Sequence, residues 1–371
     1  MNGSDQHQGF QGMQGDQSAQ SGGSSGGASG VPGAGAYGAP GPYGVQDMNN
    51  GAAMADSPLP YHRLARITLR YSWWRPLVGT LVTFGLYLFV TGVLYAVVDE
   101  LAAGRGYATG ADGTVKLSPI PDTALDLALL AVAIPFVLLT VRWIGGRPAG
   151  TVSSVTGRLR WGWLGLCALL AVPIVSVAML ASMLLPGDGG GAGFEWAGWG
   201  FFLPALGMLL VLIPFQAAAE EYLFRGWLTQ AAGAYFRPLW LALTPQAVLF
   251  ALAHGLGTPW GFADLVVFAV ATGWLTWRTG GLEAAIGLHW INNLIAFVLS
   301  AATVDGLAAD ETAADAGGLL VAVDVASILL YAGAVVWLAR RRNLDRTTPA
   351  PVIPVLSPVA FSGHPSALPR S

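Results

Sequence analysis

Long apolar stretches separated by short polar segments dominate the middle of the chain. A transmembrane helix needs about 20 mostly apolar residues, and eight stretches approach or exceed this length. They run over residues 76–98, 122–141, 161–185, 203–232, 239–256, 263–277, 282–303 and 319–339. The pattern predicts an all-α fold, a polytopic bundle of about eight transmembrane helices.

The two ends of the chain lack this pattern. Residues 1–58 are rich in Gly, Ser, Gln and Pro, and residues 346–371 are rich in Pro. Such segments bury too little apolar surface to offset their conformational entropy, so we expect both tails to be disordered. A single membrane domain, residues 60–345, is expected between them.

Composition supports the membrane assignment. Only 11% of the 371 residues are charged and 54% are hydrophobic, whereas a soluble domain carries roughly a quarter charged residues. We therefore expect the lipid bilayer as a partner and no nucleic acid. The single cysteine, Cys167, excludes an intrachain disulfide and a thiolate metal cage.

Charge is distributed unevenly between the loops. If the N-terminus is cytoplasmic, only Arg105 and Lys116 among the basic residues of the membrane domain fall in outer loops. Arginine collects on the cytoplasmic side of membrane proteins, so the count predicts a multi-pass protein of the plasma membrane with both termini in the cytoplasm. Heavy use of Ala, Gly, Val and Arg with one lysine indicates a high-GC bacterium.

Two adjacent carboxylates, Glu220 and Glu221, interrupt one of the longest apolar stretches, and Arg225 follows four residues later. A charged side chain costs a few kcal/mol or more within lipid, so such residues usually face a polar cavity with a partner. Glu221 and Arg225 share a helix face, and a structural ion pair would explain them equally well. Glu220 has no such ready explanation.

Two histidines lie in the apolar stretches, whereas His7, His62 and His364 lie in the polar segments that flank these stretches. His254 follows Phe250 by four residues, and Asn293 follows His289 by four. Residues at this spacing lie on one face of a helix. The histidines therefore bring polar groups into the same half of the chain as the glutamates.

The spacing also predicts depth. Glu220 and His254 each lie 17 residues from Arg237, in the turn between the fourth and fifth stretches. Both would stand at about the same height on neighbouring antiparallel helices. His289 lies nine residues after Gly280, a mismatch that would shrink if the turn at Arg237 projects into the cytoplasm.

A glutamate and an imidazole in a water-bearing cavity can activate a water molecule as base and then acid. An Asn amide and a second imidazole could stabilise an oxyanion. The alternative is metal-assisted hydrolysis, with His254, His289 and Glu221 as candidate ligands of zinc. The H-E-x-x-H spacing of many zinc proteases is absent from the chain.

Three motifs in this region resemble those of the CAAX protease and bacteriocin-processing (CPBP, or ABI) family of intramembrane endopeptidases. They are EEYLFRG at 220–226, Phe250-x-x-x-His254 and His289-x-x-x-Asn293, in family order within residues 195–305. The resemblance implies six catalytic residues: Glu220 and His254 activate water, Glu221 and Arg225 support the base, and His289 and Asn293 bind the oxyanion. It also implies a peptide or lipidated protein as substrate, and leaves metal use open.

Two other functions compete with peptide hydrolysis. The protein could be a membrane immunity factor or scaffold that keeps the motifs for structure alone. A transporter could use the carboxylates for proton or cation passage, but the chain has no obvious internal repeat of the kind that many transporters carry. Substitution of Glu220 separates the first alternative from catalysis.

Overall fold

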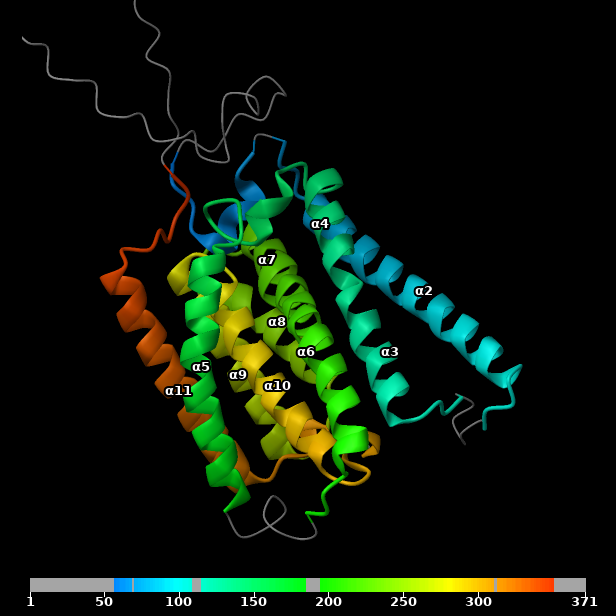
Figure 1. Cartoon of the computed structure of the whole chain (residues 1–371). Coiled ribbons are helices and arrows are strands. Elements are labelled where there is room, and N and C mark those ends of the chain that lie inside the picture. The colour runs from blue at the N-terminus through cyan, green and yellow to red at the C-terminus, as the bar shows by residue number, and fades with distance from the viewer. Residues whose placement is uncertain (1–56, 69, 109–114, 185–193, 310–311, 350–371) are drawn as a thin grey trace, which may run out of the picture. The chain divides into compact units, whose positions relative to one another are not determined.

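The computed structural model describes residues 57–68, 70–108, 115–184, 194–309 and 312–349. Within these ranges every regular element is a helix, and β-bridges occur only singly, which confirms the all-α prediction. The elements are η1 (Tyr61–Arg66), α2 (Arg75–Ala103), α3 (Pro119–Ala131), α4 (Ala133–Trp143), η2 (Ala149–Val152), α5 (Trp161–Met183), α6 (Trp199–Glu221), the π-helix η3 (Tyr222–Leu228), α7 (Thr229–Tyr235), α8 (Leu239–Ala253), α9 (Pro259–Thr279), α10 (Glu283–Ala302), η4 (Gly306–Ala308), η5 (Ala313–Asp315) and α11 (Gly318–Arg341) (Figure 1).

Seven helical stretches in the described part of the chain are long and apolar enough to cross a membrane. They are Arg75–Ala103, Pro119–Trp143, Trp161–Met183, Trp199–Tyr235, Pro259–Thr279, Glu283–Ala302 and Gly318–Arg341, and they match seven of the eight predicted spans. The eighth, predicted over 239–256, is the 15-residue helix α8, shorter than the roughly 20 residues a span needs. The chain is thus a multi-pass membrane protein.

The predicted tails, 1–58 and 346–371, lie almost entirely outside the described residues. The few that are described are ordered on the bundle. Thr347 forms a bridge with Pro60, and the N–H of Thr348 donates to the carbonyl of Leu59. The segments just before the first span and just after the last therefore pair with each other.

Two sequence features explain the form of the long stretches. The stretch over 119–143 divides into α3 and α4 at Val132, because Pro135 has no N–H to donate to the carbonyl of Ala131. The stretch from Trp199 to Tyr235 instead continues through α6, η3 and α7 for 37 residues. At about 1.5 Å per residue this exceeds the roughly 30 Å hydrocarbon core, so it projects beyond one membrane face.

The second half of the chain forms the centre of the bundle. Helix α10 packs against α5, α6 and α9, while α8 packs against α9 and α7. Helix α2 packs mainly against α4, and its Leu81 and Phe89 side chains are exposed to the extent of 73% and 68%, as expected of a lipid-facing helix. The helices that carry the predicted motifs, α6, α8 and α10, thus surround one core together with α9.

One end of the bundle, which we call the basic end, gathers the arginine-rich loops. Helices α2, α5, α8 and α10 begin there, and α4, α7, α9 and α11 end there (the top of Figure 1). Helix η1 docks on this end: Arg63 donates to the carbonyl of Gly233 and Arg66 to that of Ala234, both at 2.6 Å. These carbonyls at the end of α7 lack helical partners, so the two cations satisfy them and oppose the helix dipole.

The imidazole of His62, also on η1, is expected to make the fold less stable in acid. His62 is 4% exposed and donates from Nε2 to the carbonyl of Arg237 at 3.1 Å. Burial lowers the pKa of His62, and the charge of Arg63 lowers it further. The folded chain therefore binds this proton less readily than the unfolded chain, so stability falls as the pH drops through the ordinary histidine value of about 6.5.

Thermal unfolding in detergent at about pH 7.5 and about pH 5.5 measures this effect. Wild type should lose more of its Tm on acidification than His62→Gln, in which the amide can donate to Arg237 without titrating. Equal losses in the two proteins would contradict the assignment.

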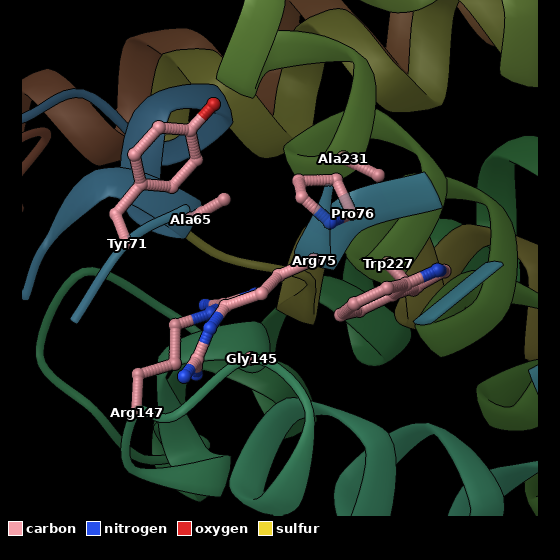
Figure 2. A pocket seen from close by; sticks show the side chains of 8 residues that line it. All are labelled: Ala65, Tyr71, Arg75, Pro76, Gly145, Arg147, Trp227 and Ala231. Atoms are coloured by element: carbon pink, nitrogen blue, oxygen red, sulfur yellow. The ribbon is translucent and has the colours of Figure 1, made fainter. Parts of the chain in front are cut away.

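A small cavity lies at the basic end, where η1, α2, α7 and the loop after α4 meet. Figure 2 shows the residues that line it: Ala65, Tyr71, Arg75, Pro76, Gly145, Arg147, Trp227 and Ala231. Its volume of about 10 Å³ admits about one water molecule. None of the predicted catalytic residues lines it, so the candidate site lies elsewhere.

Candidate functional site

The two glutamates stand at the point where α6 changes into a π-helix. Glu220 and Glu221 are the last residues of α6, and the π-helix η3 follows over Tyr222–Leu228. Glu220 is 8% exposed, whereas Glu221 and Arg225 are fully buried. Short π-helical segments are rare and are frequent at functional sites, so the backbone here departs from α-helical geometry where the charges are concentrated.

Gly226 allows a neighbouring segment to approach this π-helix. A Cβ atom at position 226 would lie 2.7 Å from Cγ2 of Val152 in η2, closer than two carbon atoms can pack. The glycine that ends the EEYLFRG motif therefore has a packing reason, which is independent of catalysis.

Glu221 is held by two partners. Its Oε1 accepts a hydrogen bond from His289 Nδ1 at 2.7 Å and lies 3.3 Å from Arg225 Nη1. Arg225 in turn donates from Nε to Thr272 Oγ1 at 2.9 Å and lies over the Phe250 ring at 4.0 Å. The pairing of Glu221 with Arg225 expected from their spacing is present, and it is buried on every side.

The same contacts set the tautomer of His289. An ionised carboxylate accepts hydrogen bonds only, so Nδ1, which faces Glu221, carries a proton. In the neutral imidazole Nε2 then carries the lone pair, and it lies 3.7 Å from Oε2 of Glu220. One histidine of α10 therefore contacts both glutamates of α6.

Glu220 has one occupied and one unoccupied oxygen. Oε1 accepts a hydrogen bond from Gln216 Nε2 at 2.6 Å, and Gln216 Oε1 accepts one from Asn293 Nδ2 at 3.0 Å. Oε2 is buried and has no hydrogen-bond partner among the described residues. A buried acceptor without a partner is costly, and here it faces the free nitrogen of His289.

Sequence reasoning missed Gln216 and Thr272. Gln216 precedes Glu220 by four residues in an otherwise apolar run, the spacing at which Gln and a carboxylate meet on a helix, so its position was readable. Thr272 carries no such signal, because a threonine in an apolar helix commonly bonds its own backbone. Its hydroxyl does so here, donating to the carbonyl of Phe268.

His254 lies at the end of α8 and is bonded within its own helix. It follows the last residue of α8, its Nδ1 donates to the carbonyl of Phe250 at 2.9 Å, and its ring lies 4.5 Å from the Phe250 ring. Among the described residues, no hydrogen bond or ion pair joins His254 to either glutamate. In the neutral imidazole this hydrogen bond places the proton on Nδ1 and leaves the lone pair on Nε2. Phe250 also contacts His289, at 6.1 Å between ring centroids.

The long stretch through α6 and α7 explains why His289 reaches the glutamates. Glu220 lies 15 residues before Tyr235, the last residue of α7, so the stretch through α6 and α7 extends further past the site at the basic end than α10 does. His289 is only six residues after Glu283, the first residue of α10. The height mismatch predicted for His289 thus disappears.

The zinc ligands considered from sequence are not assembled as a set. His289 and Glu221 bond to each other, and His254 bonds to Phe250. Within the described ranges, no three His, Cys, Asp or Glu side chains are arranged to hold a metal ion. The donor set does not fit a zinc site in this conformation, and we derive no step through a metal.

Fold and site together define a polytopic helical membrane protein with a buried network of two glutamates, an arginine, a histidine and two amides. Residues 202–295 match a family model described as "Type II CAAX prenyl endopeptidase Rce1-like". This match runs from α6 into α10 and includes all three motifs, so the resemblance read from the sequence is confirmed.

One relative carries no assigned activity. The chain is 28% identical over 235 residues to "Uncharacterized protein YyaK" of Bacillus subtilis (strain 168), an alignment that covers 60% of this chain and 76% of that protein. No solved structure matches the chain.

Proposed function

We propose that the protein is an intramembrane endopeptidase that hydrolyses a peptide bond in a membrane-anchored or lipidated substrate. The observation that carries the proposal is the free Oε2 of Glu220 facing the free Nε2 of His289 at 3.7 Å. That distance is too long for a direct hydrogen bond and suits one water molecule that donates to both atoms. The family match over 202–295 supports the same reaction class.

Hydrolysis would proceed through general base and then general acid catalysis by Glu220. Glu220 takes a proton from the water as the water oxygen bonds to the scissile carbonyl carbon. The resulting oxyanion would be stabilised by the second amide hydrogen of Asn293. Glu220 then returns the proton to the amide nitrogen as the C–N bond breaks, leaving an amine and a carboxylic acid, which then loses the second proton of the water and becomes a carboxylate.

The remaining charged residues would hold this base in place. Glu221 orients His289, and Arg225 compensates the charge of Glu221 at 3.3 Å. His254 stays a proposed catalytic residue, since its Nε2 is free to accept a hydrogen bond from water or from the substrate. Activity after chelation distinguishes this bare mechanism from one that depends on zinc.

We further propose that the protein lies in the plasma membrane with the basic end in the cytoplasm, as the distribution of arginines favours. Residues 60–345 would then form the protease domain and the two tails would be cytoplasmic. The glutamates lie nearer the basic end than the opposite end of the stretch over Trp199–Tyr235, so cleavage would occur in the cytoplasmic half of the bilayer.

Comparative membrane proteomics tests the function in cells. A deletion strain should accumulate membrane proteins with unprocessed termini. Complementation with wild type should restore the processed forms, whereas Glu220→Ala at equal expression should not. If Glu220→Ala restores both processing and phenotype, the protein acts as an immunity factor or scaffold and the proposal fails.

A further inference from the structure

We infer that Gln216 is a positioning residue that directs the catalytic proton to one oxygen of Glu220. The effect of Gln216 on turnover rests on the proposed function. Its effect on the hydrogen bonding of the Glu220 carboxylate does not. Gln216 is 4% exposed on α6 and lies between a carboxylate of its own helix and an amide of α10.

The chemistry of the neighbours fixes the orientation of the Gln216 amide. An ionised Glu220 can only accept, so it requires the NH₂ group of Gln216, which lies 2.6 Å from its Oε1. The Gln216 carbonyl then faces Asn293, which donates from Nδ2 at 3.0 Å. The reversed amide would place an oxygen against the carboxylate and would lose both bonds.

This orientation makes the two oxygens of Glu220 unequal. A proton on Oε1 would face the N–H of Gln216 and would break that hydrogen bond. Oε2 has no partner among the described side chains and faces His289. The proton taken from water therefore resides on Oε2, the oxygen that lies next to the proposed water position.

Gln216 also joins the two motif helices. Gln216 and Glu220 are four residues apart on α6, and His289 and Asn293 are four residues apart on α10. With the contact between Glu220 and His289, the Gln216–Asn293 hydrogen bond closes a ring across the two helices. One of the two amide hydrogens of Asn293 is thereby used, so the other is the one left for an oxyanion.

Gln216→Met tests the inference, because methionine keeps the length of the side chain and removes the donor. A hydrogen bond to a charged group contributes enough that its loss should lower kcat roughly ten- to a hundredfold, with little change in KM. The acid limb of the pH–rate profile should also move to higher pH, because the ionised Glu220 has lost a donor.

Gln230→Met is the matched control. Gln230 is also fully buried on the same helical stretch, and it donates to the carbonyl of Thr151 at 3.0 Å, away from the glutamates. The variant Gln230→Met should be less stable than wild type, but its pH–rate profile should not change. If Gln216→Met keeps the wild-type kcat and profile, or behaves only as Gln230→Met does, the inference is overturned.

Infrared spectroscopy of the Glu220 carboxylate keeps the inference testable without turnover. The Glu220 band is identified in ¹³C-Glu-labelled protein by subtracting the spectrum of Glu220→Gln. Because Gln216 donates to one carboxylate oxygen, the frequency of the carboxylate stretching band should differ between Gln216→Met and wild type, and should not differ between Gln230→Met and wild type. A shifted band in a protein without peptidase activity would retain the role of Gln216 and reject the proposed function, whereas activity with an unshifted band would do the reverse.

Discussion

Replacing Glu220 by Gln should lower peptide hydrolysis by about 10²- to 10⁴-fold or more while the protein remains folded. Glutamine has the shape of glutamate but cannot accept a proton from water at Oε2. The side-chain oxygen of the new glutamine can still accept the hydrogen bond that Gln216 donates to Oε1 of Glu220 in the wild type. Because a largely buried carboxylate becomes neutral, the Tm should stay equal to that of wild type or rise.

The measurement is cleavage of a prenylated or membrane-anchored peptide library by purified protein in detergent, read by mass spectrometry. Glu100→Gln is the control, because Glu100 is an exposed carboxylate near the end of α2 and should keep wild-type activity. Equal cleavage by wild type and Glu220→Gln would remove Glu220 from the mechanism.

The same assay separates the bare and zinc-dependent mechanisms. Full activity after chelation, in protein that elemental analysis finds without metal, rules out the zinc version. Loss of activity on chelation and recovery with added zinc, at one ion per active chain, would instead require the ligands to rearrange from the contacts described here.

Replacing Arg225 by Met should destabilise the protein by about 3–5 kcal/mol, because it leaves a buried carboxylate without its compensating charge. Glu221 and Arg225 are both fully buried, so water cannot solvate the remaining group. The double variant Arg225→Met/Glu221→Gln should recover much of the loss, since it removes both charges and keeps the volume.

Unfolding in a denaturing detergent titration measures these differences, and Arg142→Met is the matched control. Arg142 is exposed near the end of α4, so its loss should change stability little. A double variant as unstable as Arg225→Met alone would show that packing against Phe250 and Thr272, rather than charge pairing, makes Arg225 necessary.

Local features of the site were readable from the sequence because they depend on helix periodicity alone. Glu221 with Arg225, and Gln216 with Glu220, are each four residues apart and meet in the structure. The all-α class and seven of the spans followed from the length of the apolar stretches.

The partner of Glu220 could not be read in this way. Equal sequence distances from Arg237 favoured His254, but the structure places His289 against both glutamates. Counting residues from Arg237 and from Gly280 assumed that these two turns lie at the same height along the bundle. The stretch through α6, η3 and α7 continues for 37 residues and shifts that reference point.

The sequence by itself determined that this chain crosses the membrane several times and carries paired carboxylates, two histidines and Asn293 on three helical stretches. Those conclusions follow from hydrophobic length and the 3.6-residue period, which act within a segment. The tertiary structure alone decided that His289 lies beside Glu220 and that Asn293 reaches it through Gln216. Such contacts depend on how far each helix extends past its turn and on how the π-helix rotates the chain, and hydrophobic periodicity records neither.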